Sequence, residues 1–387
     1  MRIVIVGAGL AGLRTAEELR RAEFGGEIVL IGDEPHLPYD RPPLSKDVVR
    51  GERDDTTLKP REFYADKNID LRIGTPATAV DTAAQTVTLA GGATVSYDEL
   101  VVATGLRPRR LPGLPELAGI HVLRTIADSR ALRDDVAPGK RVLVVGAGFI
   151  GCEIAASFRA LGVDVIVVEP QQAPLAGVLG ARVGALVARM HSDEGVDIRC
   201  GAGVSAVHGT DRVTAVTLVD GTELPVDVVV LGIGAVPVTE WLDGSGVPLA
   251  DGVVCDGVGR TAVPHVWAVG DVAAWAPRRR VEHWSNAGDQ AKVIAKALVG
   301  AEIPTTAQVP YFWSDQYDVK IQALGSPSAA DDLHVVEDDG RRFLAYYSRD
   351  GIFTGVVGAG VPAKVMKLRA SLAKPTAIAA VLNPPGV

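Results

Sequence analysis

The chain has 387 residues, of which 47% are apolar, and a formal net charge of −8. This length allows two or three domains with sizeable cores, and the negative charge argues against general binding of nucleic acid. The longest apolar run, 228–238, contains two glycines and one proline and is too short to span a membrane. Because a strand follows directly on Met1 and three cysteines are widely spaced, we expect no signal peptide, no metal site and a cytoplasmic location.

The first informative segment lies at the start of the chain. An apolar strand is predicted over 2–6, the sequence Gly7-Ala8-Gly9-Leu10-Ala11-Gly12 follows it, and a helix is predicted over 13–21. In such a G-x-G-x-x-G motif the first glycine allows a tight turn and the second lets the backbone approach a pyrophosphate. The third allows close packing of helix on strand, so that the helix N-terminus faces the phosphates.

A second strand, predicted over 27–31, leads to two acidic residues, Asp33 and Glu34. An acid at about 20 positions after such a motif is placed to bind the hydroxyls of a ribose. The sequence does not choose between these two carboxylates.

The same arrangement recurs in the middle of the chain. A strand over 141–145 runs into Gly146-Ala147-Gly148-Phe149-Ile150-Gly151, a helix is predicted over 152–161, and a strand over 163–168 ends at Glu169. Sites for NADP usually place a basic residue close after this acid, but the next base here is Arg182, which predicts NADH rather than NADPH. Two complete motifs predict two dinucleotides in one chain and transfer between them.

The repeat extends further. Residues 97–105, which end in Ala103-Thr104-Gly105, resemble residues 226–234, which end in Gly234. Each segment has an aspartate that leads a buried strand, and each strand stops at a glycine. The two halves therefore indicate a duplicated nucleotide-binding module of the α/β class.

The pattern changes after about residue 306. Residues 319–323 alternate with period two, and predicted strands over 343–348 and 352–357 flank Asp350-Gly351, a type I′ hairpin signal. We expect a small α+β domain that ends in a helix over 363–372, with a frayed tail at 384–386.

Several motifs together resemble a known family. They are Tyr39-Asp40-Arg41-Pro42-Pro43-Leu44-Ser45-Lys46, Ala103-Thr104-Gly105, the second glycine motif with Glu153, Val269-Gly270-Asp271, and His283-Trp284-Ser285-Asn286-Ala287. In this order the chain resembles the NADH-dependent ferredoxin reductases of cytochrome P450 and aromatic-ring dioxygenase systems. These belong to the FAD-dependent pyridine nucleotide-disulfide oxidoreductase superfamily, in its putidaredoxin-reductase-like branch.

The resemblance implies a glutathione-reductase-like fold with FAD and NADH as cofactors. It implies an FAD-binding domain over 1–108 and 235–305, which includes a strand over 263–271 and a helix over 285–299. It also implies an NADH-binding domain over 109–234 and a C-terminal α+β domain over 306–387. A small iron–sulfur ferredoxin is the expected electron acceptor, and monomer and homodimer both stay open.

The resemblance also implies site residues. The FAD side would comprise Gly7, Gly9, Leu10, Ala11, Gly12, Asp33 or Glu34, Arg41, Pro43, Lys46, Ala103, Thr104, Gly105, Gly270, Asp271, Trp284 and Ala287. The NADH side would comprise Gly148, Phe149, Ile150, Gly151, Glu153, Glu169 and Gly234. Trp284 and Trp313 would flank the flavin and nicotinamide pocket. Lys46, near the isoalloxazine, would stabilise negative charge on the reduced flavin. Glu153 would contact the nicotinamide ribose or carboxamide and pair with Lys46.

Each of these residues also has a simpler interpretation. Lys46 can be a solvated lysine, Glu153 a favourable first-turn acid and Glu169 a surface acid. Trp284 and Trp313 can be plain core aromatics. Arg278-Arg279-Arg280 can be a solvated loop or, with Arg341, Arg342, Lys364 and Lys367, a docking patch for an acidic ferredoxin.

The predicted activity is that of a ferredoxin–NAD(+) reductase (EC 1.18.1.-), which takes hydride from NADH and passes single electrons to a ferredoxin. Because no cysteine precedes Cys152, the thiol chemistry that disulfide-reductase relatives carry out in the first helix is excluded. One alternative is a flavoprotein that reduces a quinone or monodehydroascorbate. Another is an NADH-sensing flavoprotein of the apoptosis-inducing-factor type.

Overall fold

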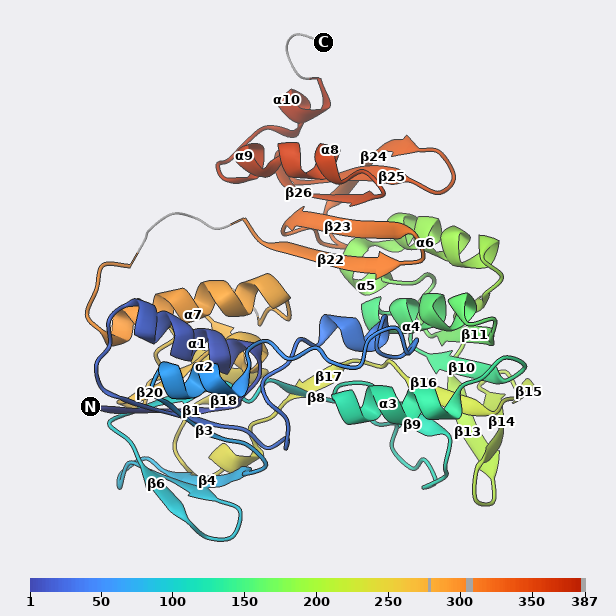
Figure 1. Ribbon diagram of the computed structural model, residues 1–387. Helices are drawn as coiled ribbons and strands as arrows, with labels where there is room; N and C mark the ends of the chain where they lie inside the picture. The colour runs from blue at the N-terminus through green and yellow to red at the C-terminus, as the bar shows by residue number, and fades with distance from the viewer. Residues whose placement is uncertain (278–279, 304–308, 384–387) are drawn as a thin grey trace. The chain divides into compact units, whose positions relative to one another are not determined.

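Arg2–Val6 (β1) is the central strand of a five-stranded parallel sheet in the computed structural model, which describes residues 1–277, 280–303 and 309–383 (Figure 1). The sheet order is β20-β7-β1-β2-β3. Its other strands are β2 (Glu27–Ile31), β3 (Ile69–Arg72), β7 (Glu99–Val102) and β20 (Val266–Ala268). Ile3, Val4 and Ile5 are fully buried, as expected for a parallel strand that is covered on both faces.

This sheet belongs to a first compact unit made of Met1–Asp40, Thr56–Arg107 and the described part of Ala235–Thr306. Helix α1 (Leu10–Arg21) packs against α7 (Trp284–Leu298), and the two lie side by side in Figure 1. The unit's further elements are α2 (Arg61–Asp66), β4 (Ala77–Asp81), β5 (Thr86–Leu89), β6 (Thr94–Ser96), β8 (Leu106–Pro108), β17 (Ala235–Pro237), β18 (Leu249–Ala250), β19 (Gly252–Cys255), β21 (Ala273–Trp275) and the 3₁₀ turns η2 (Glu240–Leu242) and η3 (Gly270–Val272).

A second parallel sheet, ordered β12-β11-β10-β16-β9, has the same core arrangement. It lies in a second unit made of Arg41–Asp55, Pro108–Gly234 and the described part of Ala307–Val387. Its elements are the 3₁₀ turn η1 (Pro42–Ser45), β9 (Ile120–Val122), α3 (Ile126–Asp135), β10 (Arg141–Val145), α4 (Phe149–Ala160), β11 (Asp164–Glu169), α5 (Ala176–Leu179), α6 (Ala181–Asp193), β12 (Asp197–Cys200), β13 (Val204–Gly209), β14 (Val213–Leu218), β15 (Glu223–Pro225) and β16 (Val228–Leu231).

The predicted duplication is confirmed at the level of strand pairing. β1 lies between β2 and β7, and β10 lies between β11 and β16, all parallel. The two leading aspartates make equivalent contacts. Asp98 accepts the backbone N–H of Arg2 at 2.5 Å, and Asp227 accepts that of Arg141 at 2.8 Å. The strand β20 pairs with β7, so the prediction that residues 263–271 return to the first module is also correct.

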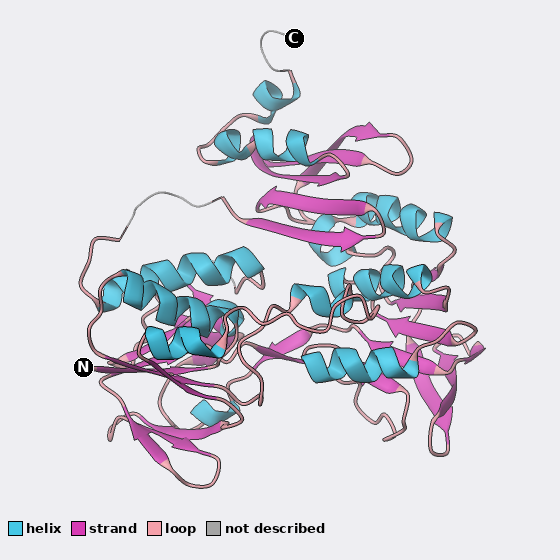
Figure 2. Ribbon diagram, viewed as in Figure 1, coloured by secondary structure: helices cyan, strands magenta, loops and turns pink. Residues whose placement is uncertain are grey.

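The C-terminal part of the second unit is an antiparallel sheet covered by short helices (Figure 2). Its order is β22-β23-β26-β25-β24. The elements are β22 (Tyr311–Gln316), β23 (Val319–Gly325), β24 (Asp332–Asp338), β25 (Phe343–Arg349), β26 (Ile352–Ala359), α8 (Pro362–Lys367), α9 (Arg369–Leu372) and α10 (Ile378–Leu382). Asp350 and Gly351 have φ of 52° and 75°, as a type I′ turn requires.

Three predicted boundaries are wrong. Helices α1 and α4 begin at Leu10 and Phe149, three residues earlier than expected, because the third glycine of each motif lies within the first helical turn. The single helix expected over 363–372 is two helices that meet at Leu368, whose side chain packs against the small C-terminal core. The tail at 384–386 lies outside the described residues.

Within the described ranges, no helix combines the length and the apolar character needed to cross a bilayer.

Candidate functional site

The first glycine loop is shaped by close backbone packing at two positions and by open space at the third. A Cβ atom at Gly7 would lie 2.1 Å from the carbonyl oxygen of Ala103, and one at Gly12 would lie 2.0 Å from that of Gly7. At Gly9 a Cβ atom would have no described heavy atom within 4 Å. The loop is therefore tightly packed at its first and third glycines and open at its second glycine, before the N-terminus of α1. This shape fits a pyrophosphate.

A second turn lies against the same helix end. Gly270 has φ of +76°, and a Cβ atom there would be 2.6 Å from the Cβ of Ala11. The buried side chain of Gln290 on α7 accepts the N–H of Gly270 at 2.8 Å and so fixes the turn. The structure thus brings Asp271 and the first glycine loop together, and Ala287 is buried one turn before Gln290. Gln290 is a functional candidate that was not predicted; the sequence signal for it is a polar residue on the buried face of a helix.

The strand ends beside the loop are also held by hydrogen bonds. Ala103 donates its N–H to Val6 at 2.7 Å, and the hydroxyl of Thr104 donates to the carbonyl of Val238 at 2.6 Å. Gly105 has φ of +68° and accepts the N–H of Val238 at 3.0 Å. In the second unit, Gly234 similarly has φ of +89° and accepts the N–H of Arg109 at 2.9 Å.

The two candidate ribose acids of the first unit differ in their surroundings. Asp33 is exposed, and its Oδ1 accepts the N–H of Glu34 at 3.0 Å. The carboxylate of Glu34 accepts the hydroxyl of Tyr39 at 2.5 Å. By strand register, Gly32 rather than Asp33 stands where Glu169 stands in the second unit.

The two tryptophans lie in different units. Trp284 begins α7, is 38% exposed and donates its indole N–H to Asp40 at 2.7 Å, so its interpretation as a core aromatic is wrong. Trp313 is half-buried on β22, and its ring stacks on Tyr311 with centroids 5.8 Å apart.

The second glycine loop repeats the geometry of the first. Cβ atoms at Gly146 and Gly151 would lie 2.4 Å and 2.1 Å from the carbonyl oxygens of Gly232 and Gly146. At Gly148 a Cβ atom would again have no described heavy atom within 4 Å. Phe149 and Ile150 form the first turn of α4, and Ile150 is 45% exposed there. This loop also fits a pyrophosphate.

Glu169 is not a surface acid. It is buried at the end of β11, where one carboxylate oxygen accepts the N–H of Ala147 at 2.7 Å and the other accepts that of Gln171 at 2.9 Å. Glu169 therefore joins the end of its strand to the second glycine loop.

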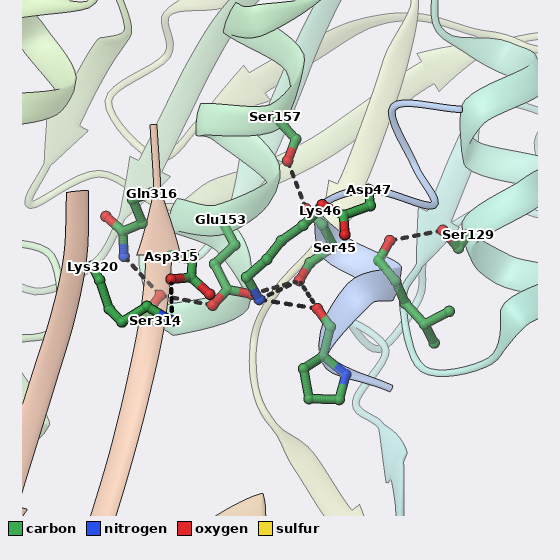
Figure 3. A network of polar contacts seen from close by, with 12 residues as sticks. Ser45, Lys46, Asp47, Ser129, Glu153, Ser157, Ser314, Asp315, Gln316 and Lys320 are labelled. Carbon is green, nitrogen blue, oxygen red and sulfur yellow. Dashed lines mark hydrogen bonds and ion pairs between the residues drawn. The ribbon is translucent and has the colours of Figure 1, made fainter. Parts of the chain in front are cut away.

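Lys46 and Glu153 meet in the second unit (Figure 3). The Lys46 Nζ lies 2.7 Å from Oε2 of Glu153, which also accepts the hydroxyl of Ser45 at 2.5 Å. Oε1 accepts the hydroxyl of Ser314 at 2.7 Å. The predicted pair is thus present, and Glu153 lies one turn into a buried part of α4 rather than in its first turn. Ser45 and Ser314 were missed, because a lone serine carries no sequence signal.

Two hydrogen bonds hold the segment that carries Lys46 in place within the second unit. Arg41 donates to the carbonyl of Arg124 at 2.5 Å, and Ser129 donates to the carbonyl of Leu44 at 2.7 Å. Pro43 and Ser45 are buried in the 3₁₀ turn η1. The solvated-lysine interpretation of Lys46 is wrong, because its side chain is only 12% exposed.

Three of the cations suggested as a docking patch are engaged with carboxylates. Arg280 is largely buried between Asp251 and Glu282. Arg341 pairs with Glu194 and Asp318, and Lys364 pairs with Glu337. Arg278 and Arg279 lie outside the described residues. The patch is therefore not supported at Arg280, whose guanidinium faces inward.

Comparison with known proteins agrees with this geometry. Residues 1–291 match the family of pyridine nucleotide-disulphide oxidoreductases, and residues 311–382 match the reductase C-terminal domain. The chain is 41% identical to a probable ferredoxin reductase, CtmF, of Castellaniella defragrans, over 93% of this chain and 91% of that protein.

Two further relatives are informative. The chain is 38% identical to the ferredoxin–NAD(+) reductase component of the biphenyl dioxygenase system of Paraburkholderia xenovorans, over 87% of this chain and 84% of that protein. The reductase in a covalent putidaredoxin reductase–putidaredoxin complex superposes with a TM-score of 0.95 at 32% identity, over 99% of this chain and 96% of that chain. The chain therefore belongs to the pyridine nucleotide-disulphide oxidoreductase family and, within it, to the ferredoxin reductases.

Proposed function

We propose that this protein is an FAD-dependent ferredoxin–NAD(+) reductase, which oxidises NADH and reduces a ferredoxin that serves a P450 or a ring-hydroxylating oxygenase. One observation carries the proposal: each unit has a glycine loop that is open at its second glycine, before a helix N-terminus. Two such cradles in one chain suit an electron transfer between two dinucleotides.

The residues of the first unit would hold FAD. Gly9 and the N-terminus of α1 would face the pyrophosphate, and Asp271, held by Gln290 through Gly270, would contact the ribityl chain. In the second unit Gly148 and α4 would face the pyrophosphate of NADH, and Glu153 would orient the nicotinamide half. When bound, the two cofactors supply the hydride donor and acceptor, and the protein supplies orientation.

The reaction balances with two molecules of a one-electron partner. One NADH and two oxidised ferredoxins give NAD⁺, one proton and two reduced ferredoxins. The absence of any cysteine before Cys152 argues against a disulfide as the acceptor. The names of the relatives, a dioxygenase-system component and a reductase in complex with putidaredoxin, support an iron–sulfur protein as that partner.

We also propose a cytoplasmic location. Its support is that Cys152, Cys200 and Cys255 are all free thiols, and that Cys152 and Cys255 are buried apart in different units. Measuring the thiol content of protein from a fractionated native cell would test this.

The decisive experiment is anaerobic stopped-flow absorbance of the purified protein, mixed first with NADH and then with an oxidised [2Fe–2S] ferredoxin. Rapid flavin bleaching followed by rapid recovery on adding ferredoxin is the expected result. Recovery only with a quinone or monodehydroascorbate would replace the ferredoxin by a small acceptor. Slow recovery with every acceptor, together with NADH-dependent dimerisation, would indicate an NADH-sensing protein.

A further inference from the structure

A line of buried polar side chains leads from Glu153 into the C-terminal sheet. The hydroxyl of Ser314 lies 2.7 Å from Oε1 of Glu153, and the amide nitrogen of Gln316 lies 3.1 Å from the Ser314 Oγ. Both side chains are fully buried, and because they are two residues apart on β22 they point to the same face (Figure 3).

The line continues to helix α6. Gln316 Oε1 lies 2.9 Å from Nε2 of His191, and the hydroxyl of Tyr317 lies 2.8 Å from Nδ1 of the same ring. His191 is 1% exposed. Four side chains, from β22, from the turn that follows it and from α6, are thus joined to the carboxylate of Glu153.

The hydrogen bonds along this line of side chains all run in one direction, from Tyr317 towards Glu153. The amide oxygen of Gln316 can only accept, so Nε2 of His191 must carry the proton. Burial lowers the pKa of His191 to about 4, so at neutral pH its Nδ1 accepts from Tyr317. The amide group of Gln316 donates to Ser314, and the Ser314 hydroxyl is left to donate to Glu153. Each donor therefore points towards the carboxylate of Glu153.

Tyr317, at the far end of this line of side chains, has an unfavourable backbone conformation. Tyr317 occupies the two-residue turn between β22 and β23 with φ of +57°, where glycine or asparagine is usual. Its ring packs edge-on against His191, with centroids 5.1 Å apart. This contact and the hydrogen bond to Nδ1 hold Tyr317 in its left-handed conformation.

The other oxygen of Glu153 binds Ser45 and Lys46. We propose that Ser314 and Gln316 are positioning residues that hold the Glu153 carboxylate in one orientation for Lys46 and for the nicotinamide half of the bound nucleotide. The C-terminal sheet thereby takes part in nucleotide recognition. This inference rests on the proposed function only in assigning the nucleotide to Glu153.

The test is equilibrium binding of NAD⁺ to the purified flavoprotein by calorimetry, which needs no ferredoxin. Ser314→Ala is expected to weaken binding about 3- to 30-fold, the range usual for coupling through packed networks. Ser314→Thr should restore it, because it returns the hydroxyl. Gln316→Met removes the hydrogen bond that Gln316 donates to Ser314. It should also weaken NAD⁺ binding, but by less than Ser314→Ala.

The matched control is Ser348→Ala. Ser348 is also buried in the same sheet, on β25. Its hydroxyl forms a hydrogen bond with His334 and has no part in the line of side chains that leads to Glu153. Its removal should change NAD⁺ affinity less than twofold.

A double-mutant cycle separates positioning from general destabilisation. If Ser314 acts through Glu153, then Ser314→Ala should add no further loss of affinity in a Glu153→Gln background. Equal losses in both backgrounds, or a lower melting temperature of Ser314→Ala with unchanged NAD⁺ affinity, would overturn the inference. Failure of ferredoxin reduction with an intact binding cycle would overturn the proposed function alone.

Discussion

The ammonium group of Lys46 lies 2.7 Å from the carboxylate of Glu153, although 107 positions separate the two residues in the sequence. Their side chains are only 12% and 5% exposed. Four measurable consequences follow from this pair and from other contacts within the second unit.

Replacing Lys46 by methionine should destabilise the protein, because it leaves a buried carboxylate without its counter-ion. Breaking such a pair costs about 3–5 kcal/mol, which corresponds to a melting temperature lower by about 5–10 °C. The control is Lys320→Met, which removes an exposed pair with Asp315 and should shift melting by about 1 °C or less. Thermal melting followed by circular dichroism checks both; equal melting of the two variants would contradict this interpretation.

The second and third glycines of the second motif should respond differently to alanine. Gly151→Ala places a Cβ atom 2.1 Å from the carbonyl oxygen of Gly146, so the loop must move and the melting temperature should fall by several degrees. Gly148→Ala meets no described atom, so it should keep the melting temperature. It should instead raise the KM for NADH about tenfold, because its methyl group enters the space for the pyrophosphate. An unchanged KM in a folded Gly148→Ala variant would exclude this loop as the phosphate site.

Glu169 should set the preference for NADH. Its carboxylate is held beside the second loop by the N–H groups of Ala147 and Gln171, where a 2′-phosphate would be repelled. The wild-type protein should bind NADH more tightly than NADPH, and Glu169→Ala should weaken NADH binding by about tenfold while leaving NADPH nearly unchanged. Titrations with both nucleotides decide the matter, and equal affinities in the wild type would refute the prediction.

Burial of His191 should make stability depend on pH. Its pKa is lowered from 6.5 to about 4 by desolvation, so between these values the unfolded chain binds a proton that the folded chain does not. Stability should therefore fall as the pH decreases from 6.5 towards 4, by about 2 kcal/mol between pH 7 and pH 5.

Melting curves of His191→Gln at both pH values should show a smaller difference than those of the wild type. The exposed His208 offers the control, since His208→Gln should keep the wild-type difference. If all three proteins lose the same stability at pH 5, His191 is not the group responsible.

Local sequence was sufficient to predict the two glycine loops. The strands 2–6 and 141–145 are nearly continuous apolar runs, and each leads directly into a G-x-G-x-x-G spacing. The third glycine of each motif packs on the carbonyl oxygen of the first, whereas the first glycine packs on a strand end that is distant in the sequence. Both loops could therefore be predicted, with errors only in where α1 and α4 begin. The hairpin at Asp350-Gly351 was equally predictable, because a type I′ turn depends on two adjacent residues.

The contacts around Glu153 could not be derived in the same way. Ser45 and Lys46 come from a segment before the second module, and Ser314 comes from the sheet after it. Serine and glutamine are common surface residues, so nothing in their local pattern marks them as buried partners of a carboxylate. Glu169 illustrates the same limit, since its position was predictable but its bonds to the loop amides were not.

The sequence by itself thus determined the two parallel modules and their glycine loops, because hydrophobic patterning and glycine spacing are both local features that can be read without knowing the distant contacts. Only the tertiary structure decided which polar groups satisfy one another in the interior. That choice depends on the register of β22 beside α4 and α6, and burial makes each unsatisfied polar group costly enough to select one arrangement.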